Sequence, residues 1–227
     1  MNLALAGLSY GITVVALLLL AIRTKKLIGI YKKGQADPTR GNDKKLRLKM
    51  AFGEIFGHTK MFNFTVVGFA HWFVMIGFFV LFGTLVTAYG QLVDPRFVIP
   101  VIGHFWVYEY ITELIAWATG IGIVALIGIR QVTLRRNKRS RFAGSGNGKA
   151  YYVEATILLI VFCVIALRGL EGALSDYTSW NRHFITTWFI AVMFKSMTLT
   201  QLENWIQIVA TIKIVGSMAW FIVIASN

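Results

Sequence analysis

Long apolar runs alternate with short polar stretches along the chain, and this pattern predicts helices that cross a membrane. The hydrocarbon core of a bilayer is spanned by about 20 apolar residues of helix. Five runs reach that length: residues 3–22, 61–90, 110–129, 151–174 and 205–225. We therefore predict an all-α integral membrane bundle of five transmembrane helices, which forms a single domain over residues 1–227.

The stretches between the runs differ in character. Within residues 23–60 we expect a helix at 44–56 and a linker around Asp37-Pro38. Residues 175–204 are mixed, and their apolar part, 184–194, is too short to span. We interpret it as an interfacial or re-entrant helix.

The basic residues are concentrated in two loops. Eleven Lys and Arg lie in residues 23–60 and seven in 130–149, out of 23 in a chain with a net charge of +13. Lys and Arg accumulate in cytoplasmic loops, so we expect both loops inside, the N-terminus outside and the C-terminus cytoplasmic. This bias explains the charge without nucleic acid, which we exclude as a partner. The cluster in the second loop is expected to contact anionic lipid: Arg135, Arg136, Lys138, Arg139 and Arg141.

Cysteine usage limits the possible cofactors. The chain has one cysteine, Cys163, inside an apolar run. An iron–sulfur cluster needs about four thiolates, so we predict no iron–sulfur cluster in this chain. No nucleotide-binding loop, catalytic triad or metalloprotease motif is present in the sequence either.

His71 is the histidine placed deepest within a predicted span, with Gly68 one turn before it and Met75 one turn after it. Neutral imidazole is a common axial ligand of haem iron, and a glycine one turn away would let a flat macrocycle approach the helix. The alternative is a histidine that hydrogen-bonds to a neighbouring helix. The remaining histidines, His58, His104 and His183, are expected at the surface.

Two cations also fall inside predicted spans, where an ionisable group is costly unless it is paired or functional. Lys213 lies mid-way along the fifth run, at a depth that could bring it opposite His71. Alternatively, Lys213 forms an ion pair with a carboxylate such as Glu113 or Glu171. Arg168 lies near the outer end of the fourth run. It could bind haem propionates through its bidentate fork or pair with Glu171. Glu154 is expected near the membrane interface.

Several blocks occur together in an order that resembles the nitrate reductase gamma-subunit-like membrane domain. They are closest to its actinobacterial branch, in which this domain is fused to a heterodisulfide reductase-like iron–sulfur domain. The blocks are EIFGHTK at 54–60, GFAHWFVMIGFF at 68–79, DPRFVIPVIG at 94–103, SRFAGS at 140–145 and ENW at 203–205.

The resemblance implies a five-helix bundle that binds haem b and passes electrons between a quinone pool and an iron–sulfur partner. It assigns His71 as the axial ligand of the haem iron, with Arg168 and Lys213 at the cofactor. Lys213 stands where the family has a second histidine. The family branch continues with cysteine-rich modules after the last helix, so we expect a fragment or a separately encoded subunit.

We therefore expect a multi-pass subunit of a quinone-linked oxidoreductase in a bacterial plasma membrane. Its expected partners are the lipid bilayer, quinone and an iron–sulfur oxidoreductase domain or subunit on the cytoplasmic side. The alternative is a haem-free anchor that docks a cytoplasmic partner. A small transporter is disfavoured, because the sequence contains no internal repeat of the kind on which many transporters are built.

Overall fold

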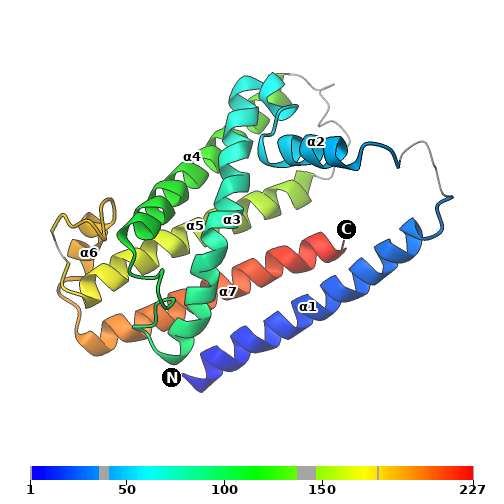
Figure 1. The fold of residues 1–227 in the computed structure, drawn as a ribbon. Coiled ribbons are helices and arrows are strands. Elements are labelled where there is room, and N and C mark those ends of the chain that lie inside the picture. The colour runs from blue at the N-terminus through cyan, green and yellow to red at the C-terminus, as the bar shows by residue number, and fades with distance from the viewer. Residues whose placement is uncertain (1, 36–40, 137–146, 178, 227) are drawn as a thin grey trace.

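The computed structural model describes residues 2–35, 41–136, 147–177 and 179–226, and these are helical almost throughout (Figure 1). The side chains of residues 134–136, 147, 224 and 226 are not described. The α-helices and the short 3₁₀ helix η2 are α1 (Leu3–Tyr31), α2 (Lys44–Phe56), η2 (Met61–Asn63), α3 (Thr65–Val93), α4 (Trp106–Arg136), α5 (Asn147–Leu174), α6 (Trp188–Phe194) and α7 (Leu199–Ser226).

Five of these helices, α1, α3, α4, α5 and α7, are long and apolar enough to cross a membrane. The predicted all-α bundle with five candidate spans is therefore confirmed, and the chain is a multi-pass membrane protein by the composition of its helices. Which end of the bundle faces the cytoplasm stays a prediction.

The end of α1 and the start of α3 differ from the predicted bounds. α1 continues through Arg23 to Tyr31, nine residues beyond the apolar run. Long basic side chains reach from a helix end into water, so a charge ends the apolar run without ending the helix. The second span begins at Thr65 rather than at 61, because η2 occupies residues 61–63.

α7 lies at the centre of the bundle and packs against α1, α3 and α5. Ile206, Ala210 and Ile214 are fully buried at this centre. α4 completes the bundle by packing against α3 and α5. Small residues allow a close approach between α3 and α4, because a Cβ on Gly77 would clash with the side chain of Thr119. α1 packs chiefly on α7, and most of its surface is exposed.

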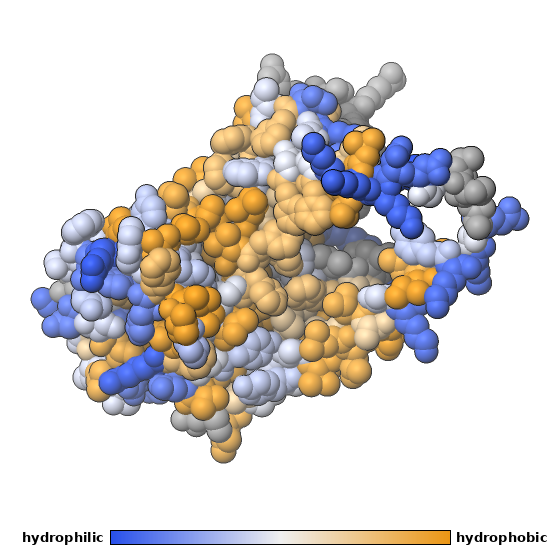
Figure 2. Space-filling view, viewed as in Figure 1, coloured by the Kyte–Doolittle hydropathy of each residue, from blue (hydrophilic) through white to orange (hydrophobic). Residues whose placement is uncertain are grey.

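The five long helices run up and down, so the basic segments meet at one end of the bundle. The basic end contains the C-terminal part of α1, α2, and the start of α5 (Figure 1). The opposite end, which we call the loop end, contains residues 94–105, 175–177 and 179–187. On the face shown in Figure 2, hydrophobic side chains cover the middle and hydrophilic ones gather at the two ends. This is the distribution that a bilayer requires.

Two predicted segments between the spans are helices in the structure. α2 covers residues 44–56 as expected, and the short apolar segment forms α6, which packs on α5. The predicted linker at Asp37-Pro38 and the basic residues Lys138, Arg139 and Arg141 lie outside the described residues.

Candidate functional site

Arg168 is the centre of a buried ion-pair cluster at the loop end. It projects from α5, and its side chain is 11% exposed. Its guanidinium donates to Glu171 over 3.0 Å and to Glu113 over 3.3 Å, and it lies 3.5 Å from Glu109. It also donates to the backbone carbonyl of His183. These contacts engage all three guanidinium nitrogens and favour the ion-pair alternative for Arg168 over propionate binding.

Glu113 ties this cluster to the segment before α6. Its carboxylate accepts from the backbone N–H of Thr186 over 2.8 Å, from the Thr186 hydroxyl over 2.6 Å and from the Thr187 hydroxyl over 2.7 Å. Trp117 donates to the same Thr186 hydroxyl over 3.0 Å. A buried charge is tolerated only when it is paired and hydrogen-bonded, and Glu113 meets that condition.

The cluster extends to both sides of Arg168. Glu109, one turn before Glu113 on α4, lies 2.6 Å from Nδ1 of His183. His183 was expected at the surface, but this contact and its 22% side-chain exposure place it within the cluster. On the other side, Gln91 of α3 donates to Glu171 over 2.6 Å. The polar groups therefore form a continuous chain across α3, α5, α4 and the segment before α6.

Lys213 is 1% exposed and lies on α7 near the middle of the bundle. Its ammonium donates to the backbone carbonyl of Thr84 over 2.7 Å and to the Thr84 hydroxyl over 2.8 Å. The alternative considered for Lys213, a pair with Glu113 or Glu171, is not formed: the hydrogen bonds of Lys213 go to Thr84, and those carboxylates are engaged by the Arg168 cluster. Thr84 is thirteen residues beyond His71 on α3, about 20 Å along the axis. Lys213 and His71 therefore lie at different depths, which contradicts the expectation that they face each other.

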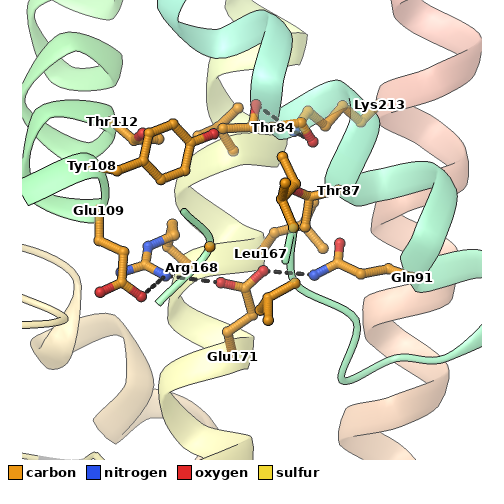
Figure 3. Close-up of a pocket in the computed structure, with 14 residues that line it drawn as sticks. Thr84, Thr87, Gln91, Tyr108, Glu109, Thr112, Leu167, Arg168, Glu171 and Lys213 are labelled. Carbon is orange, nitrogen blue, oxygen red and sulfur yellow. Dashed lines mark hydrogen bonds and ion pairs between the residues drawn. The ribbon is translucent and has the colours of Figure 1, made fainter. Parts of the chain in front are cut away.

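A small polar cavity separates Lys213 from the Arg168 cluster (Figure 3). Its volume is about 40 Å³. Figure 3 shows Lys213 and Thr84 at one side and Arg168, Glu109 and Glu171 at the other. Four more polar side chains, from α3 and α4, line the cavity beside apolar residues such as Val164 and Leu167: Thr87, Gln91, Tyr108 and Thr112.

An apolar groove begins on the opposite side of Lys213 and runs toward the basic end. Its volume is about 410 Å³, and His71 and Lys213 are both among the residues that line it. Phe79 and Phe82 line the groove and are about half exposed, so it opens on the surface that would face lipid. Ser217 of α7, one turn after Lys213, is a polar group within its lining.

His71 lies in the second turn of α3 at the basic end, closer to the helix start than predicted. Its Nδ1 is 3.1 Å from Nε2 of His58, and the two rings are stacked. Nδ1 of His58 is in turn 2.9 Å from the carbonyl oxygen of Ile55. His58 therefore lies at the surface of the protein, as expected, and also contacts His71. His58 has φ 48°, a left-handed conformation that is uncommon outside glycine but enriched in histidine.

The hydrogen bonds between these groups determine the tautomer of His71. A carbonyl oxygen only accepts, so Nδ1 of His58 carries a hydrogen, and Nε2 of neutral His58 has a lone pair. Nδ1 of neutral His71 then donates to that lone pair, which leaves the lone pair of His71 on Nε2. Metal-binding histidines commonly donate their other ring N–H in this way. The geometry therefore leaves His71 suited to bind a metal through Nε2.

Gly68 does not have the role that the sequence suggested. A Cβ at Gly68 would clash with the backbone of Met61 in η2. The glycine therefore allows η2 to pack closely on α3, and no open face for a macrocycle lies beside it. Met75, one turn after His71, lines the apolar groove as expected for a residue on the same face.

A second cavity adjoins His71 at the basic end, between α3, α4 and α5, with a volume of about 630 Å³. Arg130 and Lys149 line it together with the apolar Leu126 and Val153. Glu154, predicted at the interface, is 6% exposed and pairs with Arg130 over 2.9 Å. Cations beside an apolar cavity are suited to a ligand that carries carboxylates.

These residues fit a haem with one protein ligand and do not fit a haem held by two histidines. His71 lines both the groove and the cavity at the basic end. Lys149 could bind a propionate there, and Arg130 could do so by sharing its guanidinium with Glu154, to which it is paired through one nitrogen. Among the described residues, no other histidine lines either space. His58 is not a second axial ligand in this geometry, because its ring nitrogen is hydrogen-bonded directly to His71.

Sequence reasoning missed several members of the polar site, chiefly Glu109, Gln91, Tyr108 and Thr112. One signal was present: Glu109 and Glu113 are two carboxylates one helical turn apart, at the start of an apolar run. Intramembrane carboxylates indicate function by default. The pairing of Glu109 with His183 had no sequence signal, because 74 residues separate them.

Comparisons of this chain with protein-family models, with curated proteins and with solved structures gave no match.

Proposed function

We propose that this chain is a membrane electron-transfer subunit of a quinone-linked oxidoreductase and that it holds haem b through His71. The observation that carries the proposal is the hydrogen-bonded chain from Ile55 through His58 to His71. It leaves an imidazole lone pair on a residue that lines two spaces large enough for a cofactor. Haem bound there would supply one-electron chemistry.

The protein's own residues have three roles in this proposal. His58 holds the His71 ring in its tautomer, and Arg130 and Lys149 bind the propionates at the basic end. The apolar residues of α3, α4 and α5 exclude water from the macrocycle. A drier and less polar surrounding disfavours the more highly charged oxidation state, so these residues also influence the reduction potential.

Quinone is the proposed electron donor or acceptor, and the apolar groove is its proposed binding site. A quinone needs an apolar surface for its tail and a hydrogen-bond donor for a ring oxygen. The groove opens beside exposed phenylalanines and ends at Lys213. An ammonium has three N–H donors, and Thr84 accepts from Lys213 at two atoms, which leaves one donor for a ligand.

The proposed iron–sulfur partner docks at the basic end. The chain contains one cysteine and so cannot hold such a cluster alone. His71 lies at the same end as the basic helix α2, so a partner bound there would be on the side nearest the proposed haem. We propose that this end faces the cytoplasm of a bacterial cell, as the concentration of Lys and Arg there favours.

The absorption spectrum of the purified protein tests the haem assignment. We expect a Soret band in the wild-type protein that is lost in His71→Ala and kept in His104→Ala. His104 is an exposed histidine in the loop at the opposite end, so it is a matched control for the loss of an imidazole. A Soret band that survives in His71→Ala contradicts the assignment.

The alternative function is a haem-free anchor that docks a cytoplasmic partner at the basic end. One observation favours it: Lys213, which stands where the resemblance places a second histidine, donates to Thr84 and lies about 20 Å along α3 from His71. A wild-type protein that remains colourless after expression with added haem, and still binds a partner at its basic end, would establish the anchor instead.

A further inference from the structure

The polar cavity beside Lys213 contains buried polar atoms that lack partners. Among the described residues, Oε1 of Gln91, the Tyr108 hydroxyl and the Thr112 hydroxyl are buried without a hydrogen bond, and all three residues line this cavity. Gln91 is 1% exposed and Thr112 is 2% exposed. The Tyr108 and Thr112 hydroxyls lie one helical turn apart on α4 and can interact with each other, but Oε1 of Gln91 has no such neighbour among the described residues. Leaving a buried polar atom unpaired costs about 1–3 kcal/mol, so Oε1 of Gln91 indicates a bound polar ligand.

The size of the cavity and the chemistry of its lining identify that ligand as water. A water molecule needs roughly 10–15 Å³ of such space, so about 40 Å³ holds about three or four. Oε1 of Gln91 only accepts, whereas the two hydroxyls donate or accept. Water supplies both functions, and it can accept the remaining N–H of the Lys213 ammonium when no ligand in the groove accepts it.

The water site connects to the loop end and not to the basic end. A larger cavity of about 570 Å³ lies between it and the loop surface, and Gln91, Glu109, Arg168 and Glu171 line both spaces. On the other side of Lys213 the groove is lined by apolar residues such as Leu81, Leu85 and Val161. Apolar cavities remain dry, so a water route from the loop end stops at Lys213.

Titratable groups follow this route along its length. His183 contacts Glu109, and Glu109 and Glu171 flank Arg168. Gln91 joins Glu171 to the small cavity. Chains of carboxylates and histidines with water in transmembrane segments are typical of proton relays.

We propose that the polar cavity is a water-filled proton-exchange site that opens only at the loop end, so that Lys213 exchanges protons with the medium on that side. A ligand in the groove that contacts Lys213 then takes its protons from, or gives them to, the loop side. The water-filled cavity does not require haem at His71, so its hydration can be tested separately from the proposed function.

Cysteine accessibility to Ag⁺ tests whether water reaches the polar cavity from the loop end. Ag⁺ is small enough to enter a narrow aqueous passage. Cys163→Ser leaves a chain without cysteine, into which Thr112→Cys and Thr119→Cys are introduced separately. Both threonines lie on α4 and are buried, but Thr119 lines the apolar groove and not the polar cavity. The silver-protected fraction is read by maleimide labelling after unfolding in detergent.

We expect Ag⁺ added at the loop end to protect Thr112→Cys at least tenfold faster than Thr119→Cys. Thr87→Cys, on α3 in the same lining, is a second variant that should follow Thr112→Cys. If both cavity variants react no faster than Thr119→Cys, the cavity is not hydrated and the proposal is wrong.

The side of proton exchange is tested with Lys213→Cys in the same cysteine-free chain. A thiol reacts as its thiolate, so its alkylation by a membrane-permeant maleimide reports the pH with which the thiol equilibrates. The experiment uses sealed vesicles in which the pH on the basic side is held constant. Below the thiol pKa, we expect the alkylation rate to rise about tenfold for each unit by which the pH on the loop side is raised. A rate that follows the pH on the basic side, or neither pH, overturns the proposal.

Discussion

At the residue scale, Glu113 is the carboxylate on which the Arg168 cluster most depends. It is 1% exposed and accepts hydrogen bonds from Arg168, Thr186 and Thr187. We predict that Glu113→Gln lowers the free energy of unfolding by about 3 kcal/mol, because removing one partner leaves a buried charge less well compensated. Denaturant titration in detergent measures this loss.

Glu203→Gln is the matched control for Glu113→Gln. Glu203 also faces an arginine, Arg96, but the pair is 3.5 Å apart and exposed. Exposed ion pairs contribute about 0–1 kcal/mol, so the control should change little. Equal losses in the two variants would mean that Glu113 does not hold the cluster together.

Lys213 gives a second prediction at this scale, and it differs from what the sequence suggested. If Lys213 stood across a haem from His71, Lys213→His would convert the haem to bis-histidine ligation. Because Thr84, which Lys213 contacts, lies about 20 Å along α3 from His71, we predict that Lys213→His leaves the Soret band and the spin state of any bound haem unchanged. A shift to a low-spin bis-histidine spectrum would contradict the separation that the structure gives.

The sequence predicted some of the site and could not predict the rest. Arg168 and Glu171 are one helical turn apart, so their pair followed from helical spacing and was confirmed at 3.0 Å. The contacts of Lys213 with Thr84 and of Glu109 with His183 join helices that are distant in sequence. Such contacts depend on helix rotation and packing, and the apolar pattern of a span specifies neither.

At the element scale, Gly77 sets the distance between α3 and α4. A Cβ there would clash with Thr119, whose branched side chain is stiff and donates to the carbonyl of Phe73 over 3.3 Å. We predict that Gly77→Ala lowers the free energy of unfolding by about 1–3 kcal/mol through overpacking. Thermal unfolding followed by circular dichroism measures the change.

Gly7 on α1 offers the comparison for Gly77. A Cβ at Gly7 meets nothing within 4 Å, so Gly7→Ala should be neutral or stabilise by up to about 1 kcal/mol through helix propensity. If Gly77→Ala behaves like Gly7→Ala, α3 and α4 are not packed as closely as described.

The sequence predicted the existence of the long helices better than their ends. Hydropathy identifies a span because the bilayer requires an apolar surface over its whole thickness. It does not mark where a helix stops, because Arg23, Lys25 and Lys26 extend α1 as readily as leucine would. η2 was missed because residues 61–64 are apolar enough to look like the start of a span.

At the scale of the whole molecule, the two ends of the bundle differ sharply in charge. We predict that Lys45→Cys, on α2, reacts with an impermeant maleimide only in inverted membrane vesicles, and that Arg96→Cys reacts in intact cells. Both variants are made in the Cys163→Ser chain. Labelling of Lys45→Cys in intact cells would reverse the proposed topology.

The basic end also gives a prediction about the proposed partner. α2 carries Lys44, Lys45, Arg47 and Lys49, all exposed. Attraction between exposed charges is screened over about 8–10 Å at ordinary ionic strength. We therefore expect an iron–sulfur protein to co-purify in low salt and to dissociate as salt is raised.

Charge reversal of Lys45 and Arg47 to Glu should weaken the association, whereas Arg96→Glu at the loop end should not. Retention that is independent of both salt and these charges would contradict docking at α2.

The buried charges have a consequence for how the chain is assembled in the membrane. During synthesis, α4 leaves the ribosome with Glu109 and Glu113 before α5 brings Arg168, and Lys213 follows last, when Thr84 is already in place. An unpaired charge at mid-helix costs about 2.5–3.5 kcal/mol at the translocon. α4 therefore inserts less favourably on its own than beside Arg168 of α5, and its retention beside the translocon until α5 arrives would make the two helices enter the lipid as a pair.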